Sequence, residues 1–122
     1  MSDQQIDRSV LVGLKMLMED SYAEFLETFL KDSVLRLKQL RDARNTDELG
    51  LAAHSFKGSC GNMGAIVLVE LCRQLEERIK TRQLQNIEDV VNQIDQAYRD
   101  VRPVYEAERA GAISHKAGHH IS

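Results

Sequence analysis

Apolar residues recur at intervals of three and four along most of this chain, which is the spacing of amphipathic helices. The first such segment covers residues 6–18, and a longer one covers residues 21–43. A third helix is predicted over residues 47–62, a fourth ends near Lys80, and a fifth follows Asn86. The pattern therefore predicts an all-α protein.

Turn and cap residues separate these segments. Asp20 or Ser21 can cap the second helix, and the polar residues 45–47 can cap the third. Gly64 suits the left-handed position that ends a helix, and Asn86 can cap the fifth helix. Four long amphipathic helices joined by short turns favour an antiparallel four-helix bundle. The short additional N-terminal helix is expected to lie across one end of it.

The last twelve residues, GAISHKAGHHIS, lack a periodic apolar pattern. We therefore divide the chain into a helical bundle over residues 1–110 and a disordered tail over residues 111–122, with a cloning remnant as another reading of the tail. His115 and His119 are four residues apart and could bind a metal on a helix. The two glycines of the tail argue against a helix there, so no metal site is predicted.

Composition limits the class of protein. The chain has 122 residues, of which 43% are hydrophobic, and this suits one globular domain. Its net charge is −3 with the cations scattered, so no nucleic-acid surface is predicted. Neither a signal peptide nor a membrane-spanning segment is recognisable. Cys60 and Cys72 fall on apolar faces and are interpreted as reduced core thiols of a cytoplasmic, monomeric protein.

His54 is the residue that stands out chemically. On a helical wheel at about 100° per residue, it lies about 140° from the centre of the apolar stripe of its helix. Lys57 lies on the same outward side, and so do Gly50, Gly58 and Gly61. An interior glycine costs a helix about 1 kcal/mol relative to alanine. These glycines are therefore interpreted as clearing space around His54.

This pattern has two interpretations, one purely structural and one chemical. A lone surface histidine is usually inert, and helix glycines often serve close packing. Together, however, an outward histidine, a lysine one turn later and missing side chains around both favour a nucleophile that carries an anionic adduct. A phosphoryl group is such an adduct. The residues thus predict a phosphorylated histidine that meets a protein partner.

The segment HSFKGSCGNMGA resembles the signature of histidine-containing phosphotransfer (HPt) domains, in which His-x-x-Lys-Gly is followed by a second glycine six residues later. His54, Lys57, Gly58 and Gly64 match this pattern. Cys60 stands where a serine or alanine is more usual. The resemblance covers about residues 5–108 and implies a four-helix bundle.

The resemblance also implies a mechanism. His54 would take a phosphoryl group from an aspartyl phosphate of one receiver domain and pass it to an aspartate of another. Lys57 would stabilise the phosphoryl oxygens, and Gly58 would give them room. The receivers, which belong to response regulators and hybrid sensor kinases, would supply Mg²⁺. A docking patch around His54 is expected to include Leu51, Ser55, Gly61 and Asn62, with Leu35 as a possible extension.

Other features complete these expectations. The chain has neither Gly-x-Gly-x-x-Gly nor Gly-x-x-x-x-Gly-Lys, so we predict a phosphocarrier without cofactor or ATP site, and not an enzyme. The initiating Met close before the first helix favours a stand-alone protein. One alternative is a module of the same fold that sequesters a receiver without phosphotransfer. The other is a structural bundle with no chemistry.

Overall fold

The computed structural model describes residues 5–121 and, of residues 115–121, the backbone alone. These residues form five α-helices and one short 3₁₀ helix: α1 Arg8–Met18, η2 Glu19–Ser21, α2 Tyr22–Asp42, α3 Thr46–Asn62, α4 Ile66–Lys80 and α5 Ile87–Ile121. The predicted all-α fold is confirmed, and the helix bounds, apart from the end of α5, lie close to those expected from the apolar pattern.

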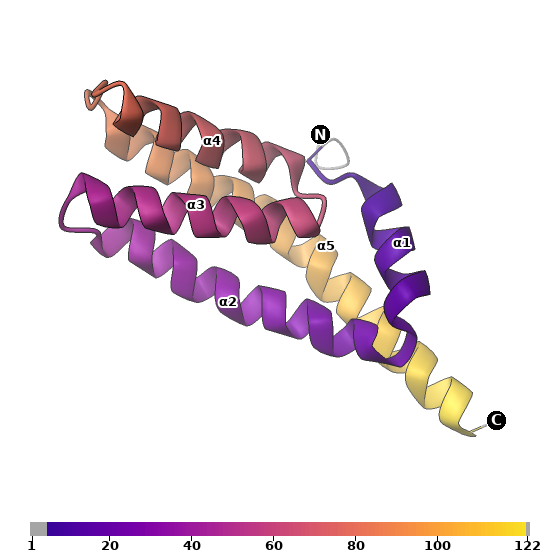
Figure 1. Cartoon of the computed structure of the whole chain (residues 1–122). Helices are drawn as coiled ribbons and strands as arrows, with labels where there is room; N and C mark the ends of the chain where they lie inside the picture. The colour runs from indigo at the N-terminus through magenta and orange to yellow at the C-terminus, as the bar shows by residue number, and fades with distance from the viewer. Residues whose placement is uncertain (1–4, 122) are drawn as a thin grey trace.

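Helices α2 to α5 form the predicted antiparallel bundle, and α1 crosses one end of it (Figure 1). Around the bundle, α3 contacts α2 on one side and α4 on the other, while α5 contacts α2 and α4. Consequently α3 and α5 lie diagonally opposite each other. A side chain that points outward from α3 is therefore far from the exposed face of α5.

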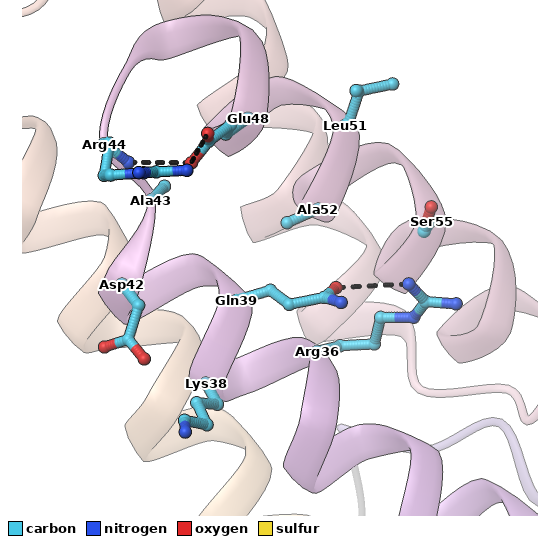
Figure 2. A pocket seen from close by; sticks show the side chains of 10 residues that line it. All are labelled: Arg36, Lys38, Gln39, Asp42, Ala43, Arg44, Glu48, Leu51, Ala52 and Ser55. Carbon is cyan, nitrogen blue, oxygen red and sulfur yellow. Dashed lines mark hydrogen bonds and ion pairs between the residues drawn. The ribbon is translucent and has the colours of Figure 1, made fainter.

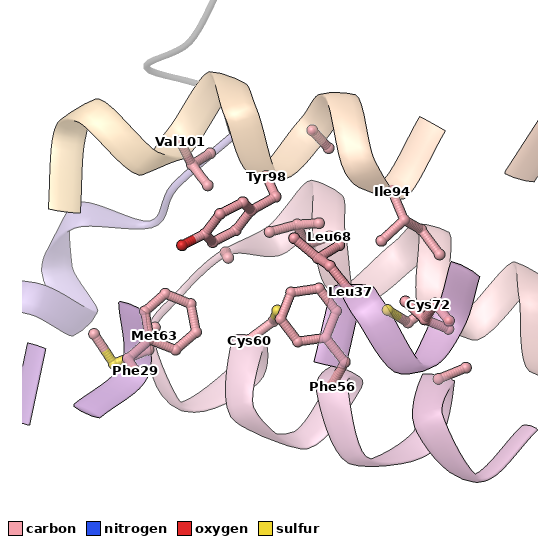
Figure 3. Packing of buried hydrophobic residues seen from close by; sticks show 14 of the residues in the cluster. Phe29, Leu37, Phe56, Cys60, Met63, Leu68, Cys72, Ile94, Tyr98 and Val101 are labelled. Atoms are coloured by element: carbon pink, nitrogen blue, oxygen red, sulfur yellow. The ribbon is translucent and has the colours of Figure 1, made fainter. Parts of the chain in front are cut away.

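The core fills the space between these four helices (Figure 3). Both cysteines are free and fully buried within it, and burial raises the pKa of each thiol. The apolar stripe predicted for the third helix is buried throughout: Leu49, Ala52, Ala53, Phe56, Cys60 and Met63. Burial of this stripe fixes which side of α3 remains exposed to solvent.

The turn between α3 and α4 is held from two directions. Asp7 N donates a hydrogen bond of 2.7 Å to Gly64 O, which joins the segment before α1 to the turn. From α5, the Tyr105 hydroxyl donates to Met63 O at 2.7 Å in a buried position. The Tyr105 bond satisfies a carbonyl at the end of α3, and the Asp7 bond ties the segment before α1 to Gly64 O, which also accepts from Ile66 N at 3.0 Å.

The predicted side-chain cap is present at the start of α3 and absent at the start of α2. At α3, Glu48 N donates to the Asn45 side chain at 2.9 Å, while Arg44 N donates to the Glu48 carboxylate at 3.0 Å. The bond from Glu48 N confirms a side-chain cap at Asn45, and the bond from Arg44 N holds the residue before the cap. At α2, η2 leads directly into the helix, and Tyr22 N donates to a backbone carbonyl of η2. Backbone geometry therefore replaces the predicted side-chain cap there.

The C-terminal segment also differs from the expected disordered tail. In the structure α5 continues to Ile121 and crosses the predicted boundary at residue 110. Ala112 packs against the core, and adding residues to an existing helix avoids the cost of nucleation. The side chains of His115, His119 and His120 are outside the part of the chain that the structure describes. The prediction that they bind no metal is therefore not tested.

Across the described part of the chain, every helix is too short or too polar to cross a membrane.

Candidate functional site

His54 lies in the middle of α3, on the side opposite the core stripe. Its side chain is 71% exposed, as the helical wheel predicts. The neighbouring residues Ala53 and Phe56 are fully buried and anchor this part of the helix. The imidazole is thus presented to solvent by a helix whose own position is fixed by the core.

Glu76 of α4 connects His54 and Lys57. Its Oε2 lies 3.0 Å from Nδ1 of His54, and its Oε1 lies 2.6 Å from Nζ of Lys57. Glu76 was not among the site residues predicted from the sequence. One carboxylate therefore holds both predicted site residues of α3 from the adjacent helix.

The charge state of Glu76 follows from its surroundings. Partial burial raises the pKa of this carboxyl, but hydrogen bonds from Lys57 and His54 outweigh the burial, so that the pKa is lowered overall. Glu76 is therefore an anion near neutral pH. Because an ionised carboxylate can only accept hydrogen bonds, Nδ1 of His54 must be the donor.

This tautomer determines the chemistry of the ring. In a neutral imidazole with the proton on Nδ1, the lone pair is on Nε2. Nε2 is the ring nitrogen farther from the backbone, and the ring belongs to a largely exposed side chain. The arrangement presents a nucleophilic nitrogen to solvent and holds the ring by its other nitrogen.

The glycines near His54 have unequal surroundings. A Cβ added at Gly58 would meet nothing within 4 Å, so this position opens directly to solvent. Added at Gly50 or Gly61, a Cβ would lie 3.9 Å from Ile79 or Val69, both on α4. The interpretation of cleared space therefore holds fully for Gly58. Gly50 and Gly61 instead lie at the edge of the contact between α3 and α4.

Gly64 has a structural role. Its φ is +70°, and a Cβ there would lie 2.7 Å from Asp7 O and 3.0 Å from the Cβ of Val10. Ala65 N donates to Cys60 O, and Gly64 N donates to Gly61 O. These two bonds form a Schellman motif, which confirms the predicted left-handed helix end.

The residues of the predicted docking patch are exposed. Leu51 is 70% exposed and Leu35 is 60% exposed, and Ser55, Gly61 and Asn62 are exposed as well. Leu51 and Ser55 also line a groove of about 540 Å³ between α2 and α3 (Figure 2). Its opposite wall includes the side chain of Arg36, which the sequence analysis did not single out.

Within the described residues, no three side chains of His, Cys, Asp or Glu are grouped so that they could hold a metal ion. The site described above consists of an exposed imidazole, a lysine and a carboxylate. Its charged groups are one cation and one anion in direct contact.

Comparison with known proteins identifies similar chains. A family model described as "Hpt domain" matches residues 24–103. The crystal structure of histidine-containing phosphotransfer protein B (HptB) from Pseudomonas aeruginosa PAO1 is similar, with a TM-score of 0.83 and 37% sequence identity. That similarity covers 87% of this chain and 95% of the HptB chain. No curated protein matches the chain.

Proposed function

The chain belongs to the Hpt domain family, and from this premise we propose that it relays phosphoryl groups between receiver domains through His54. Histidine phosphotransfer in a two-component phosphorelay is the function of this family. In the proposed relay, His54 accepts the group from a receiver aspartyl phosphate and passes it to an aspartate of another receiver. The chain is a carrier in this scheme and does not phosphorylate itself.

The contact between His54 Nδ1 and Glu76 Oε2 is the observation that carries the proposal. With the proton held on Nδ1, the lone pair of Nε2 attacks phosphorus directly, and no proton has to leave Nε2 first. The bond between phosphorus and the aspartate oxygen breaks, and that oxygen leaves as a carboxylate. The ring then carries a positive charge, which the Glu76 carboxylate 3.0 Å away stabilises.

Lys57 supports the same step. Its Nζ lies 2.6 Å from Glu76, on the surface that one helical turn shares with His54. Transfer of a phosphoryl group depends mainly on positioning and on neutralising the charge of its equatorial oxygens. We propose that Lys57 provides part of the positive charge that neutralises these oxygens and that the open space at Gly58 admits the phosphoryl group.

Free thiols at Cys60 and Cys72 suit a reducing compartment such as the cytoplasm.

Transfer from a phosphorylated receiver tests this function. We would incubate the chain with a panel of purified receiver domains from the source cell, each phosphorylated with labelled acetyl phosphate, and follow label that is acid-labile and alkali-stable. His54→Gln should abolish labelling and leave the thermal melt unchanged, because the side chain is exposed. His119→Gln makes the same change in the tail and should be labelled like the wild type.

Three results would contradict or modify the proposal. Labelling of His54→Gln at the wild-type rate would show that another residue carries the group. Binding of a receiver without transfer would favour the alternative, in which the chain sequesters a receiver. A wild-type chain that neither binds nor accepts label from any receiver would overturn the proposed function.

A further inference from the structure

The groove between α2 and α3 lies directly beside the proposed phosphorylation site (Figure 2). Leu51 and Ser55, which line it from α3, are three residues before and one residue after His54. Arg36 and Gln39 line it from α2, and Ala52 lies at its floor. The groove is thus open to solvent on the side of His54 that is turned away from α4.

Arg36 is oriented in this groove by its own helix. Its Nη1 donates to Gln39 Oε1 at 3.1 Å, and its Nε lies 3.5 Å from Asp32 Oδ2. Its side chain is only 32% exposed, and its guanidinium extends towards Ser55 (Figure 2). Only the contact with Gln39 is a hydrogen bond, because Nε is buried without a hydrogen-bond partner and its contact with Asp32 is an ion pair. The other N–H donors of Nη1 and Nη2 are available to a partner.

Any partner that reaches His54 must also cover this groove. A stable protein interface buries about 800 Å² on each side. A patch of that area centred on His54 would have a radius of about 16 Å, which is some three helical turns. Leu51 and Ser55 lie within one turn of His54. Arg36 lines the same groove as Ser55, so it too lies inside such a patch.

The charges on the two flanks of His54 differ. On the α4 flank, Glu76 neutralises Lys57 at 2.6 Å. The groove on the α2 flank is lined by three cations, Arg36, Lys38 and Arg44, against two anions, Asp42 and Glu48. Arg44 and Glu48 pair with each other at 3.6 Å. Among the lining residues the cations therefore exceed the anions by one, and Asp32, which does not line the groove, pairs with Arg36.

From these observations we infer that the α2–α3 groove selects receiver domains that present a carboxylate beside an apolar side chain. Arg36 binds the carboxylate, and the apolar side chain packs on Leu51. A receiver suits this surface because it has to bring its aspartyl phosphate to His54, and the surface around that aspartate then covers the groove beside His54. The inference rests on the proposed function, and it makes Arg36 a determinant of specificity that lies outside the reacting atoms.

Arg36→Glu tests this assignment, with Arg99→Glu as the matched control. Arg99 is 70% exposed on α5, diagonally across the bundle, so that the two variants make the same change of charge at different places. The probe is the receiver domain that transfers fastest to the wild-type chain. We expect Arg36→Glu to raise the Kd for this receiver at least tenfold and to flatten its dependence on salt. Arg99→Glu should bind as the wild type does.

The kinetic pattern separates recognition from chemistry. For Arg36→Glu the KM for the receiver should rise, while the transfer rate at saturating receiver stays within twofold of the wild type. Labelling by phosphoramidate, a small donor that needs no docking surface, should be unchanged in both variants. Arg36→Lys keeps the charge but loses the planar fork, and it should raise the Kd about threefold.

Two outcomes would overturn the assignment. Equal binding by Arg36→Glu, Arg99→Glu and the wild type would show that the groove makes no specific contact, and equal weakening would show that only net charge matters. Should Arg36→Glu melt below the wild type, Arg36→Lys decides alone, and a Kd equal to that of the wild type counts against the proposal. If the wild type accepts no label from any receiver, the proposed function fails and the groove assignment fails with it.

Discussion

The exposed middle of α3 and the turn that ends this helix lie within a dozen residues of each other, and both contain glycine. In the middle, Gly58 faces solvent, with nothing within 4 Å of an added Cβ. At the turn, Gly64 has a positive φ, and an added Cβ would lie 2.7 Å from Asp7 O. The same residue type therefore leaves space open in one region and permits close packing in the other.

This difference separates function from folding along one helix. The middle of α3 holds His54 and Lys57, whose contacts with Glu76 are made at the surface. The turn holds a hydrogen bond from Asp7 N and a buried one from the Tyr105 hydroxyl. Changes in the middle should therefore alter phosphotransfer and spare stability, whereas changes at the turn should do the opposite.

Gly64→Ala should have the largest effect on stability. Placing an L-residue in the left-handed region costs about 1–2 kcal/mol, and the clash with backbone at Asp7 adds about 1–3 kcal/mol. We expect the free energy of unfolding to fall by about 2–5 kcal/mol. Chemical denaturation followed by circular dichroism would measure this fall. The molecules that remain folded should still transfer phosphoryl groups at the wild-type rate.

Gly61→Ala is the matched control for this change. Gly61 lies in the same helix end, but its φ is outside the left-handed region, and its Cβ would make only an ordinary contact of 3.9 Å with Val69. Its free energy of unfolding should be equal to or above that of the wild type. A Gly64→Ala variant as stable as Gly61→Ala would mean that the turn does not need glycine.

The sequence alone predicted much of this comparison. Burial of Phe56 and Cys60 on one side of α3 follows from helical periodicity, and so does the exposure of His54 on the other side. The left-handed conformation of Gly64 follows from its place after the last periodic residue. Each of these features depends on neighbours within a few positions, which is the range over which a sequence pattern carries structural information.

Contacts between helices were harder to predict. Glu76 is 22 residues from His54 in the sequence. The spacing of polar residues along α4 shows which of them are exposed, but it does not show which neighbouring helix they face. One signal was available: His54 and Glu76 are each eleven residues from Ala65 at the turn. In an antiparallel helical hairpin, such positions lie opposite each other. Arg36 gave no comparable signal, because its position in the groove depends on how α2 packs against α3.

Lys57→Ala should have an intermediate effect, and it should act on transfer alone. The variant removes one charged hydrogen-bond donor, which corresponds to about 1–3 kcal/mol of transition-state stabilisation, or about 5- to 150-fold in rate. Its thermal melt should stay close to that of the wild type, because a partly exposed ion pair contributes less than about 1 kcal/mol to stability. Single-turnover transfer from a phosphorylated receiver would measure the rate.

Glu76→Gln helps to interpret that result. Glutamine keeps an acceptor oxygen for Nδ1 of His54 but removes the negative charge that stabilises the phosphorylated ring, so transfer should slow. Because Lys57 is still present to neutralise the phosphoryl oxygens, the loss of rate should be smaller than for Lys57→Ala. If both variants transferred at the wild-type rate, Lys57 and Glu76 would be a surface ion pair without a role in the chemistry.

Gly58→Ala should have a small effect on stability, with the opposite sign to Gly64→Ala. Gly58→Ala places a methyl group in open space and raises helix propensity, so the free energy of unfolding should increase by up to about 1 kcal/mol. Gly58→Gln should stabilise the helix for the same reason, but its long side chain lies one turn from His54. Transfer should therefore fall sharply for Gln and only slightly for Ala. Thermal melts measured beside transfer rates check both expectations. If Gly58→Gln melted below the wild type and transferred normally, the glycine would serve packing, and the middle of α3 would resemble its turn after all.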